Sequence, residues 1–142
     1  MPDISEQSLH VLRGVLSLSR RLRSVRPPGS VTLSELSILA ALHRLGPVPA
    51  RQLAAEERLR PQSLTRIVRK LMRLRLITRT ANPGDRREKL IALTVKGRRT
   101  LTDDLGARRA WLENAMAAAL AGPERAQLRK AAVAMLKLAQ SD

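Results

Sequence analysis

The sequence predicts a mainly α-helical fold of six helices with one small β-hairpin. Apolar residues recur at helical spacing in six segments, and proline- or glycine-containing breaks separate most of them. One strong turn signal, Asn82-Pro83-Gly84-Asp85, lies between two strand-like runs. With Trp111 as the only aromatic residue, the core must consist of aliphatic side chains, which favour helices. A chain of 142 residues suits one domain with a sizeable core.

The first helix is predicted over residues 4–25, where Asp3 and Glu6 resemble a capping box. Its apolar residues form two stripes. One stripe is enough to pack on a core, so the second indicates either a wide core face or burial by another subunit. Pro27-Pro28-Gly29 ends the helix. The stripes consist of Val11, Val15, Leu18, Leu22 and Val25, and of Leu9, Leu12 and Leu16.

A second helix is predicted over 33–45, because Thr32 and Glu35 form a good capping box. Val48 is a candidate edge strand, and a short helix follows over about 50–57. The next helix, 61–74, begins with a proline at its first position. Its apolar positions repeat at helical spacing, and its opposite face is polar and basic. The apolar positions are Leu64, Ile67, Val68, Leu71 and Leu74, and the opposite face centres on Gln62, Arg66, Arg69 and Arg73.

Two strands, 76–80 and 89–94, form the predicted hairpin, and its tip carries Asp85, Arg86 and Arg87. Thr94 is placed to cap a long helix over about 95–120. A last helix is predicted over about 123–140.

The charge is concentrated in the middle of the chain. The net charge is +15, and residues 51–99 hold 15 basic and 4 acidic residues, a net of +11. Such a concentration predicts a polyanionic partner, with nucleic acid first and an anionic membrane surface second. Single-strand binders stack bases on aromatic rings, so the near absence of aromatics favours duplex DNA.

A short helix, a turn, an amphipathic helix and a basic hairpin, in this order, predict a winged helix-turn-helix. The helix over 61–74 fits the major groove, and side chains near its start should reach base edges. Later arginines are better placed for phosphates, which position the protein without selecting a sequence. The expected base contacts are Gln62, Thr65 and Arg66, and Ser63 is a further expected DNA-binding residue. The expected backbone contacts are Arg69, Arg73, Arg51 and Arg60.

The hairpin tip is predicted to act as the wing. Arginine is favoured in a narrow minor groove, which suits Arg86 and Arg87. Asp85 has two interpretations: it accepts hydrogen bonds from the Arg87 guanidinium and directs that side chain, or it merely caps the backbone of the turn.

Other functional classes find little support. No nucleophile with a base, glycine-rich phosphate loop or plausible acidic pair predicts an enzyme, and no cofactor is expected. The chain has no cysteine, and His10 and His43 lack ligand-spaced neighbours, so no metal site is expected. Without a signal segment or a bilayer-spanning apolar run, the sequence predicts a cytoplasmic protein and no membrane partner.

The wing region resembles a known family. Three short runs are similar to the wing signature of the multiple antibiotic resistance regulator (MarR) family. They are Leu76-Ile77-Thr78-Arg79, then Asp85-Arg86-Arg87, then Leu93-Thr94 with Gly97. The order of six helices with a hairpin after the fourth agrees over essentially the whole chain. The resemblance implies that Arg87 enters the minor groove, that Asp85 is its partner, and that residues 62–69 contain the recognition-helix contacts.

The resemblance further implies a bacterial homodimeric regulator that binds a palindromic operator and represses until a small effector, often an aromatic or lipophilic acid, releases it. Dimerisation is implied through residues 1–30 and 97–142, which flank a DNA-binding part over 31–96. Leu36 and Trp111 are candidate effector contacts, although a lone tryptophan more often anchors a core or an interface. The candidate interface residues are Leu9, Leu12, Val15, Leu112, Met116, Leu128 and Met135.

A second function fits the same composition. An architectural DNA-binding protein, with no effector and little sequence preference, would carry the same positive charge. The ratio of affinities for a specific site and for random DNA separates the two functions.

Overall fold

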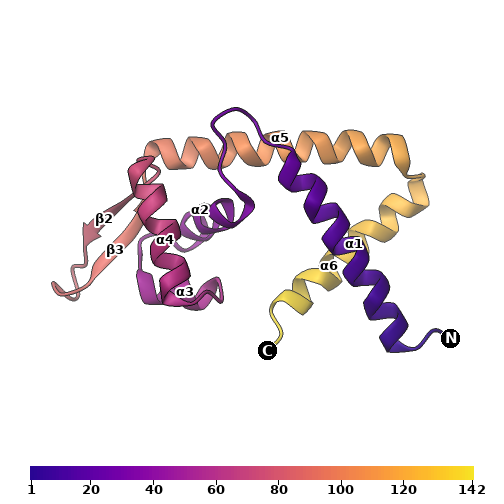
Figure 1. The fold of residues 1–142 in the computed structure, drawn as a ribbon, viewed down its shortest axis with the longest axis horizontal. Helices are drawn as coiled ribbons and strands as arrows, with labels where there is room; N and C mark the ends of the chain where they lie inside the picture. The colour runs from indigo at the N-terminus through magenta and orange to yellow at the C-terminus, as the bar shows by residue number, and fades with distance from the viewer. The chain divides into compact units, whose positions relative to one another are not determined.

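The computed structural model describes all 142 residues and contains six helices and a three-stranded antiparallel sheet (Figure 1). The predicted mainly α fold with a hairpin is confirmed, and each expected boundary agrees to within one residue. The elements are α1 (Ile4–Ser24), α2 (Leu33–Leu45), β1 (Val48–Pro49), α3 (Ala50–Glu56), α4 (Pro61–Arg73), β2 (Ile77–Ala81), β3 (Lys89–Leu93), α5 (Val95–Ala119) and α6 (Gly122–Ala139).

The chain divides into two compact units, residues 1–107 and 108–142. The first unit contains α1 to α4, the sheet and the first part of α5. The second contains the rest of α5 and all of α6. Neither α1 nor α6 has a buried residue, so the hydrophobic core belongs to the middle of the chain. None of the helices combines the length and the apolarity needed to cross a membrane.

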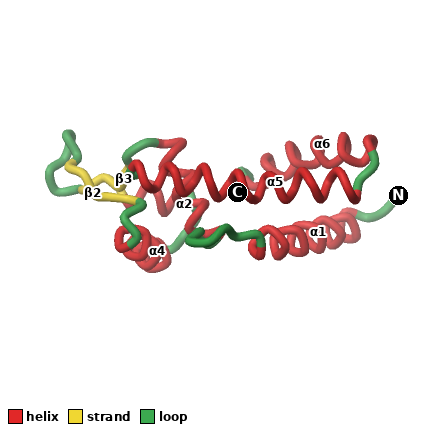
Figure 2. The backbone as a smooth tube through the Cα atoms, turned by 90° about the horizontal axis from the view of Figure 1, so that it is seen from above, coloured by secondary structure: helices red, strands yellow, loops and turns green.

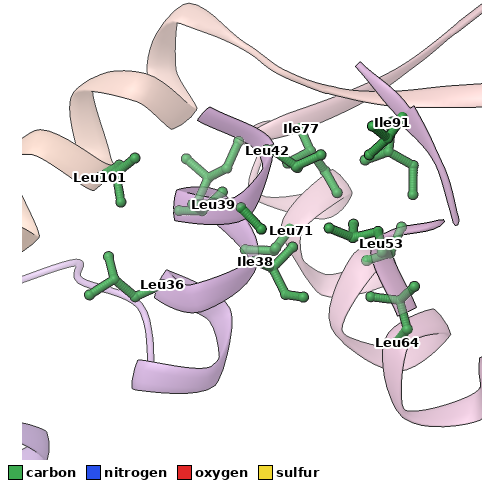
Figure 3. Packing of buried hydrophobic residues seen from close by; sticks show 14 of the residues in the cluster. Leu36, Ile38, Leu39, Leu42, Leu53, Leu64, Leu71, Ile77, Ile91 and Leu101 are labelled. Atoms are coloured by element: carbon green, nitrogen blue, oxygen red, sulfur yellow. The ribbon is translucent and has the colours of Figure 1, made fainter. Parts of the chain in front are cut away.

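The core is aliphatic and lies between α2, α3, α4, the sheet and the start of α5 (Figure 3). Ile38, Leu39, Leu53 and Leu71 have no exposed surface. Burial of one such side chain contributes about 1.5–3 kcal/mol to stability. The core therefore fixes α3 and α4 to one another and to the sheet without any aromatic residue.

The helix starts differ from one another. The predicted capping box of α2 is confirmed: the Glu35 N–H donates to Thr32 Oγ1 at 3.2 Å, and the Thr32 N–H donates to Glu35 Oε2 at 2.9 Å. The expected capping box of α1 is wrong, because the Asp3 side chain makes no capping hydrogen bond. The start of α1 is exposed, so water can satisfy its free N–H groups.

Two arginines in left-handed backbone conformation end α3 and α4. Arg58 has a φ of 51° and Arg75 a φ of 60°. After α4, the Arg75 N–H donates to the Met72 carbonyl and the Leu76 N–H to the Leu71 carbonyl, each at 3.0 Å. This pattern is a Schellman motif, which usually has glycine at the left-handed position. The turn between α3 and α4 has the same pattern around Arg58.

The sheet has the order β1-β3-β2, so the hairpin strand β3 is central. Arg79 lies opposite Ile91, and Val48 of the short strand β1 lies opposite Ile91 on its other side. Beyond the strands, the Gly84 N–H donates to Asn82 Oδ1 at 2.9 Å, which forms the predicted turn. Figure 2 shows this loop projecting from the ends of β2 and β3.

A compact junction joins the end of α4, the hairpin and α5. The Gly97 N–H donates to Thr94 Oγ1 at 2.9 Å, so Thr94 caps α5 as predicted. The Thr94 hydroxyl in turn donates to the Arg75 carbonyl at 2.7 Å, just after α4. The Lys96 ammonium donates to the Leu74 carbonyl at 2.9 Å. These bonds hold the first turn of α5 against the end of α4.

Candidate nucleic-acid interface

Helix α4 has one buried and one exposed face, as its sequence predicts. Leu64, Val68 and Leu71 are buried against the core. The opposite face is open to solvent, and it carries five of the predicted contact residues. These are Gln62, Thr65, Arg66, Arg69 and Arg73, whereas Ser63 is half-buried.

The exposed arginines of α4 are free to bind an external anion. Arg66, Arg69 and Arg73 form no ion pair and no side-chain hydrogen bond within the chain. The Thr65 hydroxyl donates to the Pro61 carbonyl at 2.8 Å, which keeps this side chain close to the start of the helix. Three uncompensated guanidinium groups on one face give this surface a strong positive potential.

Lys70 is the exception among the basic residues of α4. It pairs with Glu35 at the start of α2, and Glu35 is only 5% exposed. Burial raises the pKa of the Glu35 carboxyl, but hydrogen bonds from Lys70 and the Thr32 backbone, with the charges of Lys70 and Arg26, outweigh it and lower the pKa overall. The ion pair therefore connects α2 to the back of α4.

The wing tip presents two free arginines. Asp85, Arg86 and Arg87 are all exposed in the loop between β2 and β3. The Arg87 backbone N–H donates to Asp85 Oδ1 at 2.9 Å, and no ion pair joins their side chains. Of the two interpretations of Asp85, the structure thus shows the backbone cap, which leaves the Arg87 guanidinium unpaired.

Arg79 is not among the contact residues that the sequence predicts. This side chain lines a hollow of about 420 Å³ between α4 and β2, together with Thr65, Arg69, Met72 and Arg73. Strand alternation was the missed signal, because Arg79 shares its strand face with the buried Ile77, two residues earlier. That face is turned to the core and α4, so Arg79 joins the arginines of α4.

A second, mainly apolar cavity of about 210 Å³ lies between α3, α4 and the sheet. Arg51 and Arg79 contribute the charged groups of its lining, and Thr65 a hydroxyl. The other lining residues are Ala50, Ala54, Pro61, Leu64, Val68 and Ile91. Its position places it directly beside the exposed face of α4.

The two predicted backbone contacts outside α4 have different surroundings. Arg60 is exposed at the start of α4 and has no partner. Arg51, at the start of α3, forms an ion pair with Glu88, in which Nε lies 2.8 Å from Oε1. Hydrogen bonding to Glu88 and the nearby Asp85 charge raise the pKa of Arg51. The structure therefore leaves Arg60 free and gives Arg51 an internal partner.

The candidate dimer and effector residues belong to both units and differ in burial. Leu9, Leu12 and Val15 on α1 and Met135 on α6 are exposed, each between 39% and 53%. Leu36 is part of the buried core, whereas Trp111 is half-buried in the second unit. The remaining candidates, Leu112, Met116 and Leu128, are also half-buried.

The chain is similar to a protein-family model and to known proteins. The model of the MarR family matches residues 31–89, which run from the start of α2 to the hairpin. An HTH-type transcriptional regulator of Mycobacterium bovis is 37% identical over 134 residues, which are 94% of this chain and 90% of that protein.

Solved structures share the whole fold. A Pseudomonas aeruginosa protein described as a transcriptional regulator is 36% identical, with a TM-score of 0.76 and 99% of each chain covered. The PcaV transcriptional regulator of Streptomyces coelicolor, solved in complex with its natural ligand, is 23% identical, with a TM-score of 0.68 and 99% of each chain covered. At that identity, the likeness to PcaV concerns the fold alone.

Proposed function

Because this chain belongs to the MarR family of DNA-binding transcriptional regulators, we propose that it binds a palindromic operator as a homodimer and represses transcription. The observation that carries the proposal is the surface on which the free arginines of α4 lie beside Arg79 and the wing. No other described surface brings a major-groove helix and a basic hairpin together. Transcriptional regulators of this family are not enzymes.

In the proposed complex, α4 enters the major groove. Base edges are contacted from its first turns, by Gln62, Ser63, Thr65 and Arg66. Glutamine pairs with adenine there, and arginine with guanine. Arg86 and Arg87 at the wing tip enter the adjacent minor groove. The backbone contacts are Arg60, Arg69, Arg73 and Arg79, and Arg51 is omitted because Glu88 holds its guanidinium.

Exposed apolar side chains support the proposed dimer. Monomeric proteins rarely expose large contiguous apolar patches, yet α1 has no buried residue despite its many aliphatic side chains. We assign dimerisation to residues 1–30 and 97–142 and DNA binding to residues 31–96. The exposed aliphatic residues are Ile4, Leu9, Val11, Leu12, Val15, Leu16 and Leu18 in α1, and Val133, Met135, Leu136 and Leu138 in α6.

Selection of binding sites from a random duplex library tests the operator. We expect enrichment of an inverted repeat whose half-sites lie about 34–36 Å apart, since each subunit of a symmetric dimer presents one α4. If no motif is enriched and all duplexes bind alike, the protein is architectural and the operator proposal is wrong.

The repressor role is then tested with the selected site between a promoter and a reporter, where added protein should lower transcription.

A small acid as effector is the last part of the proposal. The cavity beside α4 is mainly apolar, and the Arg79 guanidinium in its lining has no partner within the chain, which suits a small aromatic or lipophilic carboxylate. Titrating the protein–operator complex with benzoate and a panel of phenolic acids should reveal one that releases DNA. If no acid changes operator affinity, the effector proposal fails while DNA binding stands.

A further inference from the structure

The ion pair between Arg51 and Glu88 follows from the register of the sheet. Pro49 of β1 lies opposite Leu90 of β3 in an antiparallel ladder. Two residues beyond each of them, toward the wing tip, are Arg51 and Glu88. The ladder ends at the pair of Pro49 and Leu90, and it places the first turn of α3, which carries Arg51, next to Glu88.

The geometry of the pair is two-pronged. Arg51 Nε donates to Glu88 Oε1 at 2.8 Å, and Arg51 Nη2 donates to Glu88 Oε2 at 3.4 Å. The Glu88 side chain is 27% exposed, whereas that of Arg51 is 76% exposed. Glu88 is thus partly buried just before β3, while the guanidinium that it pairs with stays exposed to solvent.

We propose that Glu88 takes the place of a DNA phosphate at Arg51, and so sets the sequence-independent strength of DNA binding. A carboxylate and a phosphate present oxygens to a guanidinium in the same two-pronged manner, so they compete for Arg51. This proposal rests on the DNA-binding surface described above. It assigns to Glu88 a role that lowers affinity rather than raising it.

The expected size of the effect follows from counterion release. Each phosphate neutralised by a protein cation changes the slope of log K against log salt concentration by about −0.9. At 0.1 M salt, one additional contact therefore strengthens binding by roughly five- to tenfold per chain. Unlike a base contact, this gain applies to any duplex, because the contact is with the backbone.

The test compares Glu88→Gln, Arg51→Gln and the double variant with the wild-type protein. Binding of a 30-base-pair duplex of random sequence is measured by fluorescence anisotropy over a range of salt concentrations. We expect Glu88→Gln to bind more tightly by roughly five- to tenfold per chain at 0.1 M salt, with a slope steeper by about 0.9. Arg51→Gln and the double variant should keep the wild-type slope, because neither has a guanidinium to release.

Two controls separate this inference from its alternatives. Glu113→Gln removes an equal charge from a comparable ion pair with Arg109 on α5, and it should leave the slope unchanged. Arg87→Gln should weaken binding and flatten the slope, and its failure to do so would count against the proposed wing contact alone. Circular dichroism verifies that each variant is folded.

Three results would overturn the role of Glu88. A flatter slope for Arg51→Gln would mean that Arg51 already contacts phosphate in the wild-type complex. Weaker binding by Glu88→Gln would mean that the pair serves to direct the wing. An equal gain for Glu113→Gln would mean that any lost acidic charge acts in the same way.

Discussion

Gly97 occupies a point where two backbones nearly touch. A Cβ atom at this position would lie 1.9 Å from the Leu76 carbonyl oxygen. The same oxygen accepts the Thr94 N–H at 3.1 Å, so the strand end cannot move away without losing that bond. Close approach, rather than an unusual backbone angle, explains why a glycine stands in the first turn of α5.

We expect Gly97→Ala to destabilise the protein by about 3 kcal/mol, because the methyl group forces α5 away from the hairpin. Gly106 in the same helix is a matched control, since a Cβ atom there meets nothing within 4 Å. Gly106→Ala should stabilise by about 0.5–1 kcal/mol. Urea unfolding measures the free energy of unfolding of the two variants, and equal effects of the two substitutions would refute the close approach.

Glu35 combines two tasks, since it caps α2 and pairs with Lys70 of α4. We expect Glu35→Gln to lower the free energy of unfolding by about 1–2 kcal/mol at neutral pH. The pKa of Glu35 is lower in the folded protein than its ordinary 4.5, so the charged form contributes stability above that value. The difference between wild type and variant should therefore narrow as the pH falls below about 4.5. Unfolding curves at several pH values measure it, and a constant difference would contradict the assignment.

Among whole elements, α4 was the most predictable from sequence. Its buried and exposed faces repeat at 3.6 residues, and Pro61 marks its first turn, so both the helix and its basic face follow from spacing. The contacts that depend on another element were missed. Glu88 lies 37 residues from Arg51, and only the strand register reveals that they meet.

Helix α1 illustrates the opposite case. Its two apolar stripes predict burial, but spacing alone does not tell whether the chain's own core or another subunit buries them. The structure shows that no α1 residue is buried within the chain. A capping pattern in the sequence does not by itself predict a capping hydrogen bond. Asp3 makes none, because the exposed start of α1 needs no side-chain cap.

The face of α4 predicts a readout of base sequence at Arg66. We expect Arg66→Ala to weaken operator binding by about 1–3 kcal/mol and to relax the preference at one base position per half-site. Repeating the site selection with the variant measures this. A uniform loss across all duplexes would identify Arg66 as a backbone contact. Arg109→Ala, which removes an equal charge from α5, should leave the selected motif unchanged.

The molecule as a whole has its charge and its apolar surface in different parts. Residues 51–99 hold +11 of the net charge of +15, whereas the exposed aliphatic side chains concentrate in α1 and α6. This separation fits a protein that meets DNA with its middle and another subunit with its ends.

We expect Leu12→Glu to convert the proposed dimer to monomers, because a carboxylate in an apolar interface is poorly solvated. Sedimentation analysis measures the change, and operator affinity should fall with it. Val95→Glu is the control for the sedimentation result alone, since Val95 is an exposed aliphatic residue outside the proposed interface. If Leu12→Glu stays dimeric, α1 does not form the interface.

The hydroxyl of Thr94 has a consequence for how the protein accommodates different DNA sites. It joins Arg75, just after α4, to the first turn of α5, and the hairpin enters the same junction through the Thr94 N–H and the Leu76 carbonyl. These hydrogen bonds tie the end of α4, the hairpin and the first turn of α5 to one another. In the proposed dimer, we expect adjustment to a longer or shorter gap between half-sites to come from the spacing of the two subunits rather than from a change of angle between α4 and the hairpin.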